Sequence, residues 1–302
     1  MKRRAFIQTA GLGLAGASLG LRQDAQVLAG ASSSPRASIK KAVKFGMVEE
    51  DLSIVEKFRL LKTLGFDGVE MDSPSDLDRD EVIRARDEAG LPIHGVVDSV
   101  HWNKTLSDPD PAVRAEGLAG LKTALDDARA YGATTVLLVP AVVNKGVSYA
   151  DAYRRSQEEI RKALPVAEEH GVKIALENVW NRFLLSPLEF ARYIDEFESP
   201  WIGAYFDIGN IVNYGWPEHW IHTLGPRILK LDVKEYSREK RDQEGPYAGF
   251  RVELGEGDCD WPAVRQALAD IGYEGWATAE IPGGDTERLR DIAARMDRIL
   301  PT

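Results

Sequence analysis

A repeating unit runs from residue 43 to the end of the chain: a short apolar run, a polar break, and a longer stretch with apolar residues at helical spacing. Several of the longer stretches end at a glycine, the residue that commonly follows the last turn of a helix. The apolar runs are short and rich in strand-forming residues, which predicts strands that alternate with helices. Eight such runs occur, at residues 44–48, 68–71, 93–98, 134–141, 173–178, 202–208, 228–234 and 275–281.

The runs are apolar throughout, which is typical of a parallel sheet covered by helices on both faces. Eight units in about 260 residues fit a closed (β/α)₈ barrel better than an open doubly wound sheet. No run is followed by the glycine-rich turn with which open sheets bind dinucleotides. We therefore predict an α/β protein with a single domain over residues 43–302, a (β/α)₈ barrel of the TIM-barrel architecture.

The N-terminal segment has the features of a targeting signal. Arg3 and Arg4 form a twin arginine, the Gly/Ala/Leu-rich segment after them is too short to span a bilayer, and residues 29–31 (Ala-Gly-Ala) fit a cleavage site. The sequence predicts a twin-arginine signal peptide over 1–31, a linker over 32–42, and a periplasmic protein with no membrane attachment after cleavage. The alternative is a weakly basic tail without a targeting role.

Charge and cysteine content exclude several classes of protein. The 38 basic and 48 acidic residues give a net charge of −10, with no basic run beyond the N-terminus, so a nucleic acid would be repelled. The single cysteine, Cys259, cannot form an intramolecular disulfide or a zinc–thiolate cluster. Any metal in this protein must therefore be held by oxygen or histidine ligands.

Each of the last four predicted strands ends in one carboxylate after an apolar run: Glu177, Asp207, Asp232 and Glu280. Chemistry in such barrels takes place where the strands end, so the four side chains should converge. Buried carboxylates repel one another unless a cation compensates their charge, and ligation by oxygens alone suits Mg²⁺ or Mn²⁺ better than Zn²⁺. Taken singly, each acid could instead cap a helix or pair with a basic neighbour.

Other polar residues end the earlier strands. Glu70, Asp72 and Asp98 are explained equally well by ligand contact, by helix capping or by a salt bridge in a loop. His101 and Trp102 together are typical of a wall that faces a sugar. A surface histidine beside a tryptophan that packs in the protein would give the same sequence pattern.

These residues resemble the xylose isomerase-like family of sugar isomerases and epimerases, (β/α)₈ enzymes that include ketose 3-epimerases. The resemblance covers almost all of residues 43–300 and is carried by "ALENVWNRFLLSPLEF", "AYFDIGN", "ILKLDVKEYSR", "GEGDCDWPAV" and "ATAE". It implies a divalent metal held by Glu, Asp, His and Glu from four successive strands, positions occupied here by Glu177, Asp207, Asp232 and Glu280. Asp232 stands where the family has histidine, which puts an anionic oxygen donor in place of a neutral ligand, and so either favours harder ions or marks a degenerate site.

Three further positions bear on substrate specificity. The family's ketose 3-epimerases resemble one another in a glutamate and a histidine at the places of Phe183 and Asn210, so the exact ketose specificity does not carry over. Arg238 matches an arginine that contacts substrate in the family.

The resemblance implies proton abstraction next to a carbonyl group, with Glu177 and Glu280 as the acid/base pair. It also implies a carbohydrate substrate and a homo-oligomer. We expect the substrate to be contacted by Arg238, Lys234, His101, Trp102, Trp180, Asn181, Asn210 and Glu70. Export favours a free sugar, a ketose or a 3-keto sugar over a sugar phosphate. The alternatives are a 3-keto-glycoside lyase or deglycosidase on the same site, and a sugar-binding barrel without catalysis.

Overall fold

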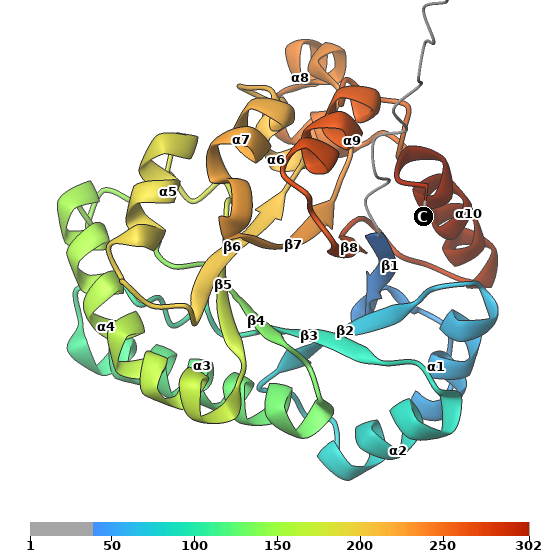
Figure 1. Cartoon of the computed structure of the whole chain (residues 1–302), viewed down its shortest axis with the longest axis horizontal. Coiled ribbons are helices and arrows are strands. Elements are labelled where there is room, and N and C mark those ends of the chain that lie inside the picture. The colour runs from blue at the N-terminus through green and yellow to red at the C-terminus, as the bar shows by residue number, and fades with distance from the viewer. Residues whose placement is uncertain (1–38, 302) are drawn as a thin grey trace, which may run out of the picture. The chain divides into compact units, whose positions relative to one another are not determined.

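Eight parallel strands close into a barrel in sequence order, so the predicted fold is confirmed (Figure 1). The structure is a computed structural model that describes residues 39–301. The predicted signal peptide and the first residues of the predicted linker lie outside the described residues. The strands are β1 (Ile39–Lys44), β2 (Gly68–Ser73), β3 (Ile93–Asp98), β4 (Thr135–Leu138), β5 (Lys173–Glu177), β6 (Ile202–Asp207), β7 (Ile228–Val233) and β8 (Gly275–Ala279).

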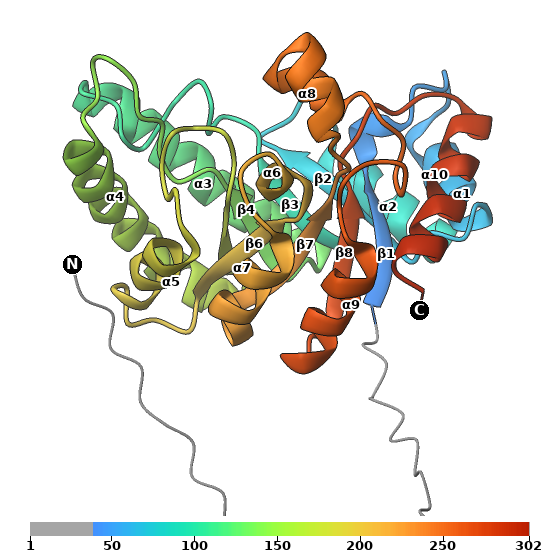
Figure 2. The same ribbon diagram turned by 90° about the horizontal axis from the view of Figure 1, so that it is seen from above.

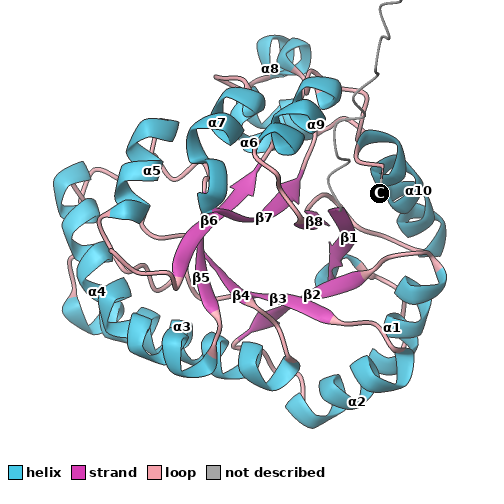
Figure 3. Cartoon of the chain, in the orientation of Figure 1, coloured by secondary structure: helices cyan, strands magenta, loops and turns pink. Residues whose placement is uncertain are grey.

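Helices surround the barrel, as Figure 3 shows. Three of them end as predicted at a glycine with positive φ, namely Gly90, Gly132 and Gly171, because only glycine takes this conformation without strain. The helices are α1 (Ile54–Thr63), α2 (Arg79–Ala89), α3 (Pro111–Tyr131), α4 (Tyr149–His170), α5 (Pro187–Asp195), α6 (Gly209–Val212), α7 (Pro217–Leu224), α8 (Arg238–Glu244), α9 (Trp261–Asp270) and α10 (Thr286–Ile299). Short 3₁₀ helices are η1 (Phe45–Met47), η2 (Gly225–Arg227) and η3 (Pro246–Phe250).

The first strand lies earlier than predicted. Residues 45–47 form η1, whereas residues 39–42, which the sequence assigns to the linker, pair with β8 as part of β1. The three lysines of this strand make its hydrophobicity pattern unlike that of a strand, but Lys41 and Lys44 each pair with a carboxylate. Lys41 donates to Asp297 of α10 at 2.6 Å outside the barrel, and Lys44 reaches carboxylates inside it.

The main hydrophobic core fills the space between strands and helices, and a smaller cluster of Leu137, Ala175 and Tyr205 packs inside the barrel. Within residues 39–301, none of the helices has the length and apolar character needed to cross a bilayer. In Figure 2, α8 lies on the side where the strands end, so the segment after β7 is placed beside the barrel mouth.

Candidate functional site

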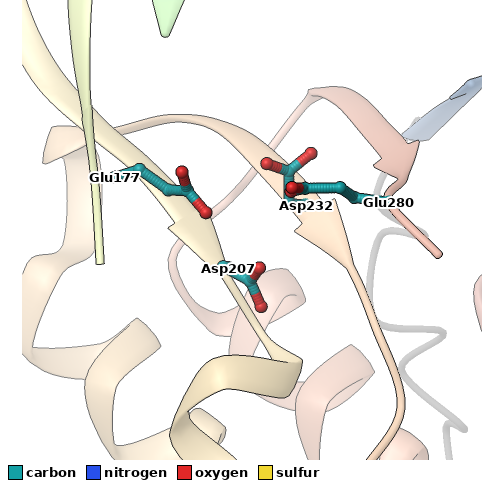
Figure 4. A group of neighbouring side chains, drawn as sticks. All are labelled: Glu177, Asp207, Asp232 and Glu280. Atoms are coloured by element: carbon teal, nitrogen blue, oxygen red, sulfur yellow. The ribbon is translucent and has the colours of Figure 1, made fainter. Parts of the chain in front are cut away.

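The four predicted carboxylates come together at the barrel mouth, as Figure 4 shows. One oxygen from each of Glu177, Asp207, Asp232 and Glu280 lies within 4.8 Å of the others. Asp207 and Asp232 are directly paired in the ladder between β6 and β7, which fixes their alignment. Asn178 holds Asp207 in place, because its side chain bonds both the backbone nitrogen and the backbone oxygen of Asp207 at 2.8 Å.

Two lysines lie among these carboxylates. The Lys44 Nζ is 2.5 Å from Glu70, 3.0 Å from Asp232 and 3.9 Å from Glu280. The Lys234 Nζ is 2.7 Å from Asp207, 3.2 Å from Glu280 and 4.0 Å from Glu177. With Glu70 included, five carboxylates face two ammonium groups, which leaves three negative charges without a partner when all five carboxylates are ionised.

The donor set fits a divalent cation. Glu177 Oε1, Asp207 Oδ2, Asp232 Oδ1 and Glu280 Oε2 are buried and receive no hydrogen bond from the described residues, although the lysines lie at ion-pair distance. Buried oxygens without a partner cost free energy, and a hard cation that takes carboxylate oxygens would satisfy all four. Such an ion would also offset two of the three unpaired charges.

The charges around the site shift the pKa values of Glu177 and Glu280 in opposite directions. Burial and the nearby charge of Glu280 raise the pKa of Glu177 well above its ordinary value. Burial acts in the same direction on Glu280, but the ammonium groups of Lys234 and Lys44 outweigh it and lower the pKa of Glu280 to about 2. Burial also raises the pKa values of Asp207 and Asp232.

A cavity of about 670 Å³ opens over the cluster. Seven residues predicted to take part in binding or chemistry line it: Glu177, Glu280, Lys234, His101, Trp102, Trp180 and Asn210. Asn210 is fixed by two bonds, from its backbone nitrogen to Asp207 and from its side chain to the Asn178 oxygen.

His101 is buried and presents a defined donor to the cavity. Its Nδ1 accepts a hydrogen bond from the Val139 nitrogen at 3.2 Å, so the ring hydrogen is on Nε2. Burial lowers the pKa of His101 to about 4, which keeps the ring neutral at pH 7.

Three predicted substrate contacts do not reach the cavity. Arg238 donates instead to the carbonyl oxygens of Val212 and Gly215 at 3.0 and 2.9 Å, because it begins α8 and turns toward the loop after α6. Asn181 is buried and donates to the Ala141 oxygen at 2.8 Å, which makes it a structural residue of its loop. Glu70 is buried, does not line the cavity, and is linked to the site by its ion pair with Lys44.

Lys44 is the functional candidate that the sequence analysis missed. It lines the cavity, and its ammonium group lies between the end of β1 and the carboxylates of three other strands. The available signal was a lysine directly after the buried pair Ala42 and Val43, at what proves to be the end of β1.

Known proteins resemble this chain along most of its length. It is 28% identical over 282 aligned positions to an L-ribulose-5-phosphate 3-epimerase of Escherichia coli, covering 85% of this chain and 96% of the relative. Two solved structures share the fold. A 3-keto-D-glucoside 4-epimerase from E. coli has a TM-score of 0.71 at 18% identity, with 87% and 99% of the two chains covered. A D-psicose 3-epimerase from Clostridium cellulolyticum has a TM-score of 0.69 at 20% identity, with 86% and 98% covered.

Residues 58–299 match the family described as xylose isomerase-like TIM barrel. This match includes the four clustered carboxylates, all of which lie within the matched range. The chain is therefore a member of the xylose isomerase-like TIM-barrel family.

Proposed function

We propose that this protein is a metal-dependent sugar epimerase or isomerase that moves a proton on a carbon next to a carbonyl group. The observation that carries the proposal is the group of four buried carboxylate oxygens at the mouth of the barrel, which receive no hydrogen bond from the residues that the structure describes. The names of the similar proteins support it, since they are sugar epimerases.

Glu177, Asp207, Asp232 and Glu280 would hold the ion, with Mn²⁺ or Mg²⁺ preferred because all four ligands are carboxylates. When bound, such an ion polarises a carbonyl group and its neighbouring hydroxyl group. The acidity of the adjacent C–H bond rises as a result, and the side chains then need only to move the proton.

Glu177 and Glu280 are suited to move that proton, because they approach the cavity from β5 and from the residue after β8. One carboxylate removes the proton from the sugar and the other returns it, to the opposite face for an epimer or to the adjacent carbon for an isomer. Lys234 lies within 4.0 Å of both glutamates and would hold a substrate oxygen between them. The Nε2–H group of His101 would donate to a second substrate oxygen.

The cavity favours a substrate without a phosphate group. Among the described residues that line it, there is no arginine, and both lysines already face carboxylates. Export through the twin-arginine route, which we propose from residues 1–31, agrees with an unphosphorylated sugar. A free ketose or a 3-keto sugar is the substrate class that we propose.

The proposal is tested by exchange of carbon-bound hydrogen with deuterated water, followed by NMR on D-fructose, L-ribulose and methyl 3-keto-β-D-glucoside. The wild type with Mn²⁺ should exchange the hydrogen next to the carbonyl of at least one of these sugars, and Glu280→Gln should abolish the exchange. Asp72→Asn is the matched control, because Asp72 lines the same cavity but is exposed and outside the carboxylate cluster.

Metal content measured by plasma mass spectrometry separates loss of the ion from loss of the acid/base group. A wild type that takes up no Mn²⁺, or that takes it up and exchanges none of the three sugars, would contradict the proposal.

A further inference from the structure

The cavity has aromatic sides that the proton chemistry does not use. Trp102 follows β3 and Trp180 follows β5, while Tyr247 and Phe250 belong to η3 in the segment after β7. All four line the cavity of about 670 Å³. That volume lies in the range of sites that enclose drug-sized ligands, about 300–1,000 Å³, and exceeds what one six-membered sugar ring fills.

One aromatic side is a rigid wall. The Trp180 ring lies 4.9 Å from Phe250 and 5.2 Å from Tyr247 between ring centroids, and its Nε1 donates to the Asn210 oxygen at 2.9 Å. These contacts fix the plane of the indole, so the wall exists before any ligand arrives.

The buried ring of Tyr236 supports this wall from behind. Its hydroxyl donates to the Pro246 oxygen at 2.8 Å and its ring lies 4.9 Å from Phe250. Gly249 packs against the same ring so closely that a Cβ atom there would lie 2.3 Å from it. The absence of a side chain at Gly249 therefore lets η3 lie flat on Tyr236.

Two of the cavity aromatics are far more exposed than large rings usually are. Tyr247 is 72% exposed and Trp102 is 49% exposed. Binding is favoured when a ligand covers exposed aromatic surface and removes it from water. An uncharged sugar ring, through its C–H groups, or an aromatic ring, through its π face, can cover such surface.

Charge restricts what can cover these rings. Asp72 is exposed at the cavity, the carboxylate cluster lies at its base, and within residues 39–301 no lining cation is free of a carboxylate. An anionic group would therefore be repelled.

We infer that the cavity contains a second subsite, between Trp102 and the wall of Trp180, Tyr247 and Phe250, that takes an uncharged ring joined to the reacting sugar. Of the two substrate types proposed above, the substrate is then a 3-keto sugar in the form of a glycoside, with its sugar over the carboxylates and its second ring against the aromatics. This inference rests on the proposed function, because that function places the reacting sugar.

The test is isothermal titration calorimetry of the full chain supplied with Mn²⁺. Methyl and phenyl β-glycosides of D-glucose, D-galactose and D-mannose are compared, and cellobiose and lactose replace the phenyl group by a second sugar. The wild type should bind at least one two-ring ligand about fivefold more tightly than its methyl counterpart. Tyr247→Ala and Trp102→Ala should each lower that preference to about twofold or less.

Trp216→Ala is the matched control, since Trp216 is 56% exposed and does not line the cavity. A wild type without preference for a second ring, including one that binds none of these ligands, would overturn the subsite. So would an equal loss of preference in Trp216→Ala. Mn²⁺ binding is measured in parallel. If the chain binds Mn²⁺ but shows no preference for a second ring, only the subsite is overturned. If it prefers a second ring but does not bind Mn²⁺, the subsite is supported and the proposed metal chemistry is overturned.

Discussion

Replacing Lys44 by methionine should destabilise the metal-free protein and strengthen its response to Mn²⁺. The Lys44 Nζ is 2.5 Å from Glu70 and 3.0 Å from Asp232, and both carboxylate side chains are fully buried. Removing one partner of a buried ion pair costs about 3–5 kcal/mol, because the other charges stay behind uncompensated. A chain of this length loses roughly 2 °C of melting temperature per kcal/mol, so Tm should fall by about 6–10 °C.

Mn²⁺ should restore part of this loss. An ion among the carboxylates supplies the charge that Lys44 no longer supplies, and it meets one competing cation, Lys234, instead of two. We expect the Kd of the Lys44→Met protein for Mn²⁺ to be at least about tenfold lower than that of the wild type, equivalent to about 1.4 kcal/mol. Mn²⁺ should therefore raise the Tm of Lys44→Met by about 3 °C more than it raises the Tm of the wild type. Differential scanning calorimetry with and without Mn²⁺ measures both quantities.

Lys41→Met is the control on the same strand. Lys41 pairs with Asp297, whose side chain is largely exposed, so its removal should cost about 1 kcal/mol or less. It should leave the Mn²⁺ response unchanged. A Lys44→Met protein with the Tm and the Mn²⁺ response of the wild type would refute the view that Lys44 compensates the charge of the site.

Four further results are expected. Asp232→Asn should bind less Mn²⁺ per chain by plasma mass spectrometry, because one anionic ligand is lost; equal metal content would remove Asp232 from the site. Arg238→Met should lower the free energy of unfolding by about 1–3 kcal/mol through two lost hydrogen bonds but leave the KM for sugar unchanged, and a raised KM would restore Arg238 as a substrate contact. Burial raises the pKa of Asp98 from 3.8 to about 7, so its ionisation destabilises the fold as pH rises from 4 to 7, by on the order of 4 kcal/mol at pH 8. Asp98→Asn should therefore raise Tm at pH 8 and change it little at pH 4, and an equal change at both values would contradict this. L-Ribulose should bind more tightly than L-ribulose 5-phosphate by calorimetry, since the cavity has no free cation among the described residues; the reverse order would refute an unphosphorylated substrate.

The order and type of the elements could be predicted because most strands are apolar, the helices have apolar residues at helical spacing, and several helices end at a glycine. The run at 93–98 coincides with β3, whereas the run at 44–48 missed β1. A hydrophobicity pattern treats lysine as a surface residue, but in β1 Lys41 pairs with a carboxylate outside the barrel and Lys44 with carboxylates inside it. Such pairing is a property of the closed barrel and leaves no trace in local sequence.

The carboxylate cluster could be predicted for a similar reason, since parallel strands in a barrel bring their ends to one place. The direction of the Arg238 side chain could not be predicted in this way. The position of a residue in a sequence motif does not fix where a long side chain points at the start of a helix. Phe183 illustrates the same limit. It is buried against Tyr149, Tyr153 and Tyr193, so this position serves packing and does not face the cavity.

The candidate site is assembled from both ends of the described chain. Lys44 comes from the first strand and Glu280 follows the last, and the two strands pair only when the barrel closes. During synthesis β8 emerges after the other seven strands, so the complete ligand set exists only once the barrel has closed. We propose export by the twin-arginine route, which carries folded proteins, and binding of a metal ion. If both proposals hold, the chain would acquire the ion in the cytoplasm and take it across the membrane. The metal content of the precursor, compared with that of the periplasmic form, tests this: a metal-free precursor would show that loading takes place after export.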